Sequence, residues 1–168
     1  MTKEQVIIVD QNDNQIGIVP RSEMIRKKLH HRASAILVFN SQGELFVHQR
    51  SLNVGRRPGY YDLKAGGVVA AGETTKENAF RELGEELGIK NIPLDFLFLF
   101  RHPDDQDAPS FQNVFKCVYD GPIKLEEASI TQGKFMSFDE IKEFTQKEKF
   151  VPEALTIFNK YLEEYYAN

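Results

Sequence analysis

The amino-acid sequence predicts an α+β domain in which a mixed β-sheet lies between helices. Strand-like and helix-like segments are intermixed along the chain, as in sheets that helices cover on their faces. Residues 33–39 form a nearly continuous apolar run, which is typical of a strand covered on both faces. The chain has 168 residues, 41% of them hydrophobic, and is long enough for one domain with a sizeable core.

The expected elements follow in order along the chain. Residues 6–9 and 15–19 are predicted to form a hairpin, because turn-forming residues cluster at 11–14. A short helix is expected at 22–29 after Pro20, and strands at 33–39 and 45–49 flank a turn at 41–44. A longer helix at 75–87 precedes strands at 94–100, 113–119 and 134–136. Two helices close the chain, one capped by Ser137 and Glu140 and one beginning at Pro152.

The helix at 75–87 is predicted to carry two different faces. Thr74 and Glu77 form a capping box at its start, and Gly88 suits the left-handed residue that closes a helix. At about 100° per residue, one arc of this helix is apolar and expected to be buried, whereas the adjacent arc is acidic. The apolar arc contains Ala79, Phe80, Leu83 and Leu87, and the acidic arc contains Glu82, Glu85 and Glu86.

The acidic arc predicts a metal site. Glu82 and Glu86 are like charges at i,i+4, which destabilises a helix by roughly a few tenths of a kcal/mol. All three glutamates lie toward the helix C-terminus, where the macrodipole disfavours anions. A divalent cation would reverse both effects, because hard oxygen ligands three and four residues apart converge on one Mg²⁺ or Mn²⁺. The alternative is a solvated acidic face, the usual role of a charge run.

The loop before this helix supplies further candidate residues. Gly66 and Gly67 have no side chains, so backbone groups there can approach a metal or phosphate closely, and the Gly66 carbonyl is a candidate ligand. Glu73 is expected to orient Arg81 through a charge-assisted hydrogen bond. The alternative for Arg81 is an exposed i,i+4 pair with Glu85, which contributes little stability.

The spacing of these residues resembles the Nudix box. Gly67 is followed after five residues by Glu73, and after seven more by a dense cluster that begins at Arg81. The matching positions are Gly67, Glu73, Arg81, Glu82, Leu83, Glu85, Glu86, Gly88 and Ile89, so the box spans residues 67–89. The resemblance implies a Nudix hydrolase with an α/β/α sandwich, and we expect residues 1–168 to form one Nudix domain.

Four segments outside the box are similar to the Nudix branch related to isopentenyl diphosphate isomerase, namely residues 29–33, 39–43, 48–51 and 58–62. The isomerase works with a cysteine in the segment leading to the box, whereas residues 63–67 contain neither cysteine nor histidine. Because protonating an alkene requires placed acid and base groups, a hydrolase is favoured over an isomerase. His31 matches an isomerase metal ligand, but its histidine partner is missing, so a structural or surface-exposed histidine is expected rather than a metal ligand.

The resemblance implies hydrolysis, dependent on Mg²⁺ or Mn²⁺, of a nucleoside diphosphate linked to another moiety X. The expected metal ligands are Gly66, Glu82, Glu85 and Glu86, and the expected catalytic residues are Glu82, Glu85 and Arg81, with Glu85 or Glu82 as general base. Gly67, Glu73 and Gly88 are expected to support the box, and Arg50, Arg56, Arg57 and Lys64 to bind phosphates. Many family members carry a downstream glutamate before the position of Phe135. This chain instead offers Ser129 and Gln132 there, with Glu126 and Glu127 slightly earlier. A diphosphate-binding or regulatory protein without turnover is the alternative function.

The composition excludes several classes of protein. A net charge of −4 and a pI near 5.6 give no general attraction for nucleic acid or an anionic membrane, so the expected partner is a small phosphorylated substrate. The single cysteine, Cys117, excludes an internal disulfide and is expected to be buried in a strand. No signal peptide or membrane-length apolar run is found, and a cytoplasmic protein is expected. Substrate specificity is expected to come from the loops at 53–60 and 101–110.

Overall fold

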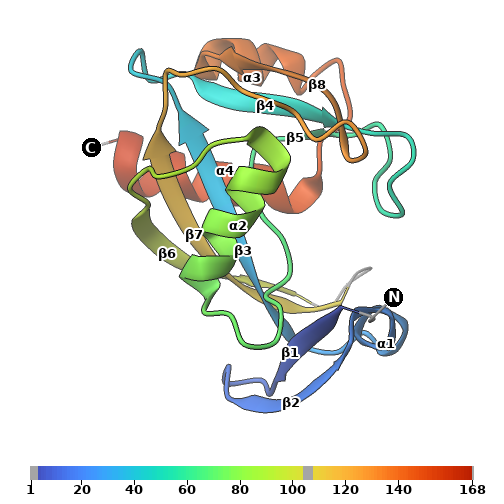
Figure 1. Ribbon diagram of the computed structural model, residues 1–168. Coiled ribbons are helices and arrows are strands. Elements are labelled where there is room, and N and C mark those ends of the chain that lie inside the picture. The colour runs from blue at the N-terminus through green and yellow to red at the C-terminus, as the bar shows by residue number, and fades with distance from the viewer. Residues whose placement is uncertain (1–3, 104–107, 168) are drawn as a thin grey trace.

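The computed structural model describes residues 4–103 and 108–167, and these contain an eight-stranded mixed sheet with helices on both faces (Figure 1). The strands are β1 (Gln5–Val9), β2 (Gln15–Pro20), β3 (His31–Phe39), β4 (Leu45–Arg50), β5 (Tyr61–Asp62), β6 (Asp95–His102), β7 (Ser110–Val118) and β8 (Ile130–Met136). The helices are α1 (Arg21–Lys27), α2 (Thr75–Leu87), α3 (Phe138–Phe144) and α4 (Pro152–Tyr161), which continues into a π-helical turn at Leu162–Tyr166. Every expected element is present, whereas β5 was not predicted.

The centre of the sheet is the parallel pair of β3 and β7. Their register runs from His31 opposite Ser110 to Phe39 opposite Val118. The other strand pairs are antiparallel: β1 with β2 and β3, β4 with β3, β5 and β8, and β6 with β7. The sheet is therefore mixed, as the sequence predicts.

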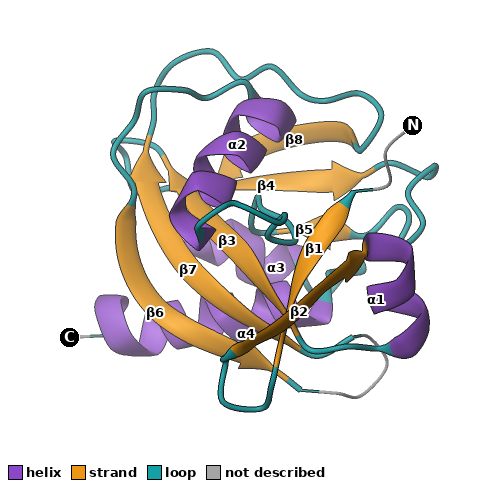
Figure 2. Ribbon diagram, turned by 60° about the horizontal axis from the view of Figure 1, so that its bottom comes forward, coloured by secondary structure: helices purple, strands orange, loops and turns teal. Residues whose placement is uncertain are grey.

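Helices cover the two faces of the sheet unequally, with α2 on one face and α3 and α4 on the other (Figures 1 and 2). Side chains of β3 alternate between the two cores, because successive residues of a strand point to opposite faces. Ile36 and Val38 pack in the core that contains Leu83 of α2. Leu37 lies in the other core with Ile157 of α4. This alternation confirms the expected α/β/α sandwich.

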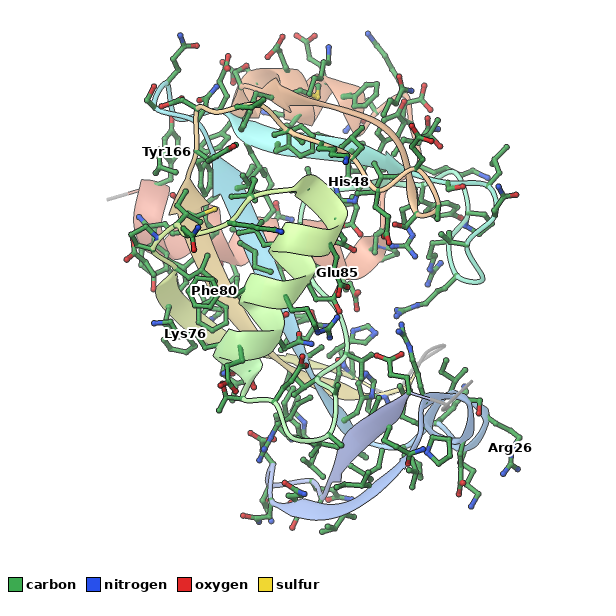
Figure 3. All side chains as sticks on the ribbon, in the orientation of Figure 1. Arg26, His48, Lys76, Phe80, Glu85 and Tyr166 are labelled. Carbon is green, nitrogen blue, oxygen red and sulfur yellow. The ribbon has the colours of Figure 1, made fainter. Side chains whose placement is uncertain are left out.

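The structure corrects several details of the predicted core. Phe80 was expected on the buried arc of α2, but it is 38% exposed and lies on the opposite side of the helix from Glu85 (Figure 3). Asn78 is fully buried in its place and accepts a 2.6 Å hydrogen bond from the Ser34 hydroxyl. Cys117 is buried in β7, as expected. Along the part of the chain that the structure describes, no helix is both long and apolar enough to cross a membrane.

The expected loop at 101–110 is shorter than predicted. Arg101 and His102 are the last residues of β6, and Ser110 is the first residue of β7. Residues 104–107 lie outside the described part of the chain.

Candidate active site

Helix α2 is fixed at both ends by the residues that the sequence singles out. The Thr74 hydroxyl accepts a hydrogen bond from the Glu77 backbone at 3.2 Å, and the Glu77 carboxylate accepts one from the Thr74 backbone at 2.8 Å. Gly88 closes the helix with φ of 69°. Because both ends are held, the three glutamates of the last two turns have a defined position beside the preceding loop.

The glycine pair brings this loop into contact with the glutamates. The Gly66 backbone N–H donates to Glu86 Oε2 at 3.0 Å. Gly66 has φ of 133°, and a Cβ there would lie 2.1 Å from the Ser34 carbonyl oxygen. A Cβ at Gly67 would lie 2.6 Å from Glu82 Oε1. Any side chain at either position would therefore collide with the sheet backbone or with a candidate ligand.

Arg81 contacts three carboxylates at once. Its Nε donates to Glu73 Oε1 at 2.6 Å and its Nη2 to Glu73 Oε2 at 3.3 Å, the bidentate geometry that makes such pairs strong. Its Nη1 lies 3.0 Å from Glu85 Oε2 and 3.2 Å from Glu82 Oε1. Both pairings considered from the sequence, with Glu73 and with Glu85, are therefore present. The hydrogen bonds from Arg81 also lower the pKa of Glu73.

Burial raises the pKa values of two box glutamates and so disfavours their ionised forms. Desolvation raises the pKa of Glu86 to about 8, although the hydrogen bond from Gly66 opposes this rise. Desolvation also raises the pKa of Glu82, and the Arg81 charge opposes it. The side chain of Glu85 is 53% exposed. A cation beside Glu82 and Glu86 would therefore stabilise their charged forms.

The side chains as arranged do not form the ligand group expected from the sequence. Among residues 4–103 and 108–167, no three His, Cys, Asp or Glu side chains are grouped closely enough to hold a metal ion. The reason is the local pairing: Glu82 and Glu85 turn toward Arg81, and Glu86 turns toward the Gly66 backbone. Glu82 and Glu85 thus share Arg81 as their partner, whereas Glu86 accepts a hydrogen bond from the loop.

A cleft of about 930 Å³ brings the candidate residues together. Its walls include all nine residues predicted to act in catalysis or to bind metal or phosphate, together with the supporting residue Gly67; the nine are Arg50, Arg56, Arg57, Lys64, Gly66, Arg81, Glu82, Glu85 and Glu86. The supporting residues Glu73 and Gly88 lie in the loop before α2 and at its end. Residues from β4, the loop after it, the Gly-Gly loop and α2 thus meet around one space, although up to 36 residues separate them in sequence.

The cationic residues of the cleft are engaged with protein groups. Lys64 Nζ lies 3.4 Å from Glu153 Oε1, and Arg56 Nη2 lies 3.6 Å from Glu153 Oε2. Arg50 donates to the Arg56 carbonyl at 3.0 and 3.1 Å and lies 3.7 Å from Asp62. The Arg57 guanidinium lies over the Tyr60 ring, 5.8 Å from its centroid. All four cationic residues line the cleft, and each of them contacts another protein group.

Sequence reasoning missed several polar residues of the cleft wall. Asp62, Ser110, Gln112 and Glu153 all line the cleft and are buried. Asp62 belongs to a segment whose family likeness is visible, but Glu153 carried no signal beyond its place after Pro152. Glu126 also lines the cleft, and its backbone N–H donates to the Glu86 carbonyl at 3.0 Å.

His31, expected to be structural or surface-exposed, is buried and lies in the lining of the cleft. It is 7% exposed, and its Nδ1 lies 3.1 Å from the Leu29 carbonyl oxygen. Burial lowers the pKa of its imidazole, so the neutral form is favoured.

The fold and the arrangement of the box residues are those expected of a Nudix hydrolase, and comparison with known proteins agrees with this class. The NUDIX domain model matches residues 29–158. A Pseudomonas aeruginosa protein described as an uncharacterized Nudix hydrolase is 36% identical over 162 residues, covering 95% of this chain and 94% of the relative. The chain therefore belongs to the Nudix family, and the expected enzyme class is confirmed.

Solved structures agree on the fold. A Deinococcus radiodurans protein gives a TM-score of 0.82 at 23% identity, covering 94% of this chain and 98% of that chain. A bifunctional NMN adenylyltransferase/ADP ribose pyrophosphatase from Francisella tularensis, complexed with AMP and a Mn ion, gives a TM-score of 0.65 at 20% identity. That match covers 80% of this chain and 42% of the larger protein. At these identities the likeness establishes the shared fold alone.

Proposed function

We propose that the protein hydrolyses the diphosphate bond of a nucleoside diphosphate linked to another moiety X, and that it requires Mg²⁺ or Mn²⁺. The observation that carries this proposal is the cleft of about 930 Å³, whose lining contains the three box glutamates together with Arg50, Arg56, Arg57 and Lys64. Hydrolysis of a diphosphate needs both kinds of group. Cationic side chains neutralise the phosphate oxygens, and carboxylates bind the metal and activate the attacking water.

The donor set fits a hard divalent cation. Glu82, Glu85, Glu86 and Gly66 all line the cleft, and the carboxylate and carbonyl oxygens that these residues offer are the ligands that Mg²⁺ prefers. Burial raises the pKa values of Glu82 and Glu86, and a cation bound there would stabilise their ionised forms. When bound, the metal neutralises phosphate oxygens and lowers the pKa of a water. The Mn ion in the Francisella tularensis structure supports the same choice of cofactor.

The chain's own groups then have separate roles. Glu85 or Glu82 accepts a proton from the water that attacks phosphorus, while the anhydride P–O bond breaks and its electrons leave on the bridging oxygen. Arg81 fixes both carboxylates through its contacts of 3.0 and 3.2 Å. Arg50, Arg56, Arg57 and Lys64 bind the phosphate oxygens of the substrate.

Two other functions receive less support. A diphosphate-binding or regulatory protein needs no water-activating carboxylate, yet the full set of box glutamates is present. An isomerase needs an acid and a base near the box, but the single cysteine, Cys117, is buried in the core behind α2. We also propose a cytoplasmic location and a small phosphorylated partner, on the basis of the single cysteine and the net charge of −4.

The test is turnover of a panel of nucleotide sugars, dinucleoside polyphosphates, nucleoside triphosphates and prenyl diphosphates. Release of phosphate or nucleoside monophosphate is expected with Mg²⁺ or Mn²⁺ and not with EDTA. Glu86→Gln is expected to lower kcat by at least about 10²-fold without loss of folding. The matched control is Glu163→Gln, an exposed glutamate of the C-terminal π-helical turn. Equal turnover in EDTA would overturn the metal requirement, and tight diphosphate binding without product would favour the binding function.

A further inference from the structure

A buried asparagine near the start of α2 connects the helix to the sheet. Asn78 is fully buried and is not one of the positions at which the chain matches the Nudix box. Its Oδ1 accepts a 2.6 Å hydrogen bond from the hydroxyl of Ser34 on β3. Its Nδ2 donates to the Val68 carbonyl at 2.9 Å and to Glu73 Oε2 at 3.1 Å. One side chain thus joins α2, β3 and the loop before α2.

The orientation of the Asn78 amide is fixed by its neighbours. Both partners of Nδ2 are acceptors, one a backbone carbonyl and the other a carboxylate. A reversed amide would put Oδ1 against both of them, and buried acceptors that face each other lose their hydrogen bonds. Ser34 is 1% exposed, so Asn78 rather than solvent accepts from its hydroxyl. The two side chains therefore form a specific buried pair.

The hydrogen bond to Glu73 connects Asn78 to Arg81. Glu73 Oε2 accepts from Asn78 at 3.1 Å, from Arg81 at 3.3 Å and from the loop backbone at 3.2 Å. An arginine and a carboxylate that contact only each other can turn together as one ion pair, whereas these additional donors fix the carboxylate in place. Arg81 Nη1 then contacts Glu82 at 3.2 Å and Glu85 at 3.0 Å. The position of the guanidinium therefore depends on Asn78.

Ser34 also holds the other neighbour of Glu82. Its backbone N–H donates to the Gly67 carbonyl at 2.9 Å. A Cβ on Gly67 would lie 2.6 Å from Glu82 Oε1, so the two residues are close neighbours. Glu82 therefore lies between Gly67 and Arg81. Ser34 fixes the first of these through its backbone and the second through Asn78, and a change in this network would displace the Glu82 carboxylate.

We propose that Asn78 is a positioning residue for hydrolysis, and that it acts through Glu73 and Arg81. Held by Ser34, it keeps the guanidinium where it contacts the carboxylates of the box. Asn78 itself does not line the cleft, so it touches neither the metal nor the substrate. This inference rests on the proposed pyrophosphohydrolase function, and it predicts a loss of kcat rather than of substrate affinity.

The first experiment needs no substrate. It follows the Nε–H signal of Arg81 in ¹H–¹⁵N NMR spectra, because this N–H donates to Glu73 Oε1 at 2.6 Å, and the spectrum of Arg81→Lys assigns the signal. The wild-type N–H should be protected from exchange with water. Asn78→Leu and Ser34→Ala should lower this protection about 10-fold while circular dichroism shows folded protein. Unchanged protection in the folded variants overturns the inference.

The second experiment measures steady-state kinetics with Mg²⁺ on the compound of the substrate panel that wild-type protein cleaves fastest. Ser34→Ala and Asn78→Leu should each lower kcat about 10-fold and leave KM within about 2-fold of wild type. Because both residues act through the same contacts, the double variant should lose no more activity than Asn78→Leu alone. Losses that multiply in the double variant, or a raised KM with unchanged kcat, contradict the inference.

Matched controls carry the same substitutions at exposed turns. Ser41→Ala, between β3 and β4, and Asn12→Leu, between β1 and β2, should keep the wild-type Arg81 signal and kcat. A purely structural role for Asn78 would lower the unfolding free energy but leave the Arg81 signal protected in folded molecules. Ser34→Ala, the smaller change, decides the question if Asn78→Leu does not fold. If wild-type protein cleaves no compound of the panel but both variants lose Arg81 protection, the proposed function fails while the coupling of Asn78 to Arg81 stands.

Discussion

Gly67 lies directly against the carboxylate of Glu82, so closely that a Cβ on residue 67 would be 2.6 Å from Glu82 Oε1 and 2.7 Å from its Cδ. The neighbouring Gly66 meets a different obstacle, the carbonyl oxygen of Ser34 at 2.1 Å. The two adjacent glycines therefore protect different things: Gly67 the position of a candidate ligand, and Gly66 the packing of the loop on β3.

We predict that Gly67→Ala lowers kcat about 10- to 100-fold while the melting temperature changes little. The added methyl group can be accommodated by moving the flexible end of Glu82, which displaces the carboxylate from its place in the cleft. Steady-state kinetics with Mg²⁺ and a thermal melt measure the two quantities. Wild-type kcat in Gly67→Ala would show that the position of Glu82 is unimportant.

Gly66→Ala should instead lower the stability of the fold. Its φ of 133° is strained for alanine, and the Ser34 carbonyl is backbone that cannot step aside. We expect a drop in unfolding free energy of about 2 kcal/mol or more, measured by denaturant titration. A stable Gly66→Ala protein would mean that the loop can adopt another path over β3.

Local signals made helix α2 predictable from its sequence. Its capping box and closing glycine are short-range features, and its bounds match residues 75–87. Phe80 was wrongly predicted to be buried. Helical periodicity shows which residues share an arc of the helix, but it does not show how much of that arc the neighbouring sheet covers. Strand β5 was missed because its two residues, Tyr61 and Asp62, pair with β4 only once the tertiary fold has formed.

The buried polar residues of the cleft wall could not be predicted from the sequence either, because they too come together only in the tertiary fold. Gln112 of β7 and Glu153 of α4 are 41 residues apart in sequence. They meet only because α4 packs against the sheet that contains β7. Lys64 was recognised as a candidate phosphate ligand, but its ion pair with Glu153 depends on the same packing. The organisation of residues 1–168 as one domain stays a prediction.

Arg81→Lys should weaken the box even though the charge is kept. The guanidinium forms two hydrogen bonds with Glu73 and reaches Glu82 and Glu85 as well, whereas an ammonium group is a point charge that cannot span all three. We expect a loss of about 1 kcal/mol in unfolding free energy and about 10-fold in kcat. Denaturant titration and steady-state kinetics give the two numbers. Unchanged kinetics would show that Arg81 has no influence on the catalytic carboxylates.

The contribution of His48 to stability should fall as the pH drops from about 6.5 to about 4, because His48 is buried in its neutral form. Desolvation lowers the pKa of His48 from 6.5 to about 4, so the unfolded chain binds a proton in this window that the folded chain does not. The contribution of His48 is complete above pH 6.5 and declines by about 3 kcal/mol toward pH 4. Denaturant titrations at several pH values should give a smaller decline for His48→Leu than for wild-type protein. Parallel pH profiles would contradict the assignment.

Gly84 is the one box glycine whose replacement should strengthen the protein. A Cβ there would lie 3.6 Å from Lys90 Cε and 3.7 Å from the Ile89 carbonyl oxygen, which are ordinary contacts. The position is inside α2, where glycine is less favourable than alanine by about 0.5–1 kcal/mol. Gly84→Ala should therefore raise the unfolding free energy by about that amount and leave kcat within about 2-fold of wild type. Gly88→Ala provides the contrast, because φ of 69° at the helix end disfavours alanine and should lower stability. A destabilised Gly84→Ala protein would reveal a close approach at α2 that the static packing does not contain.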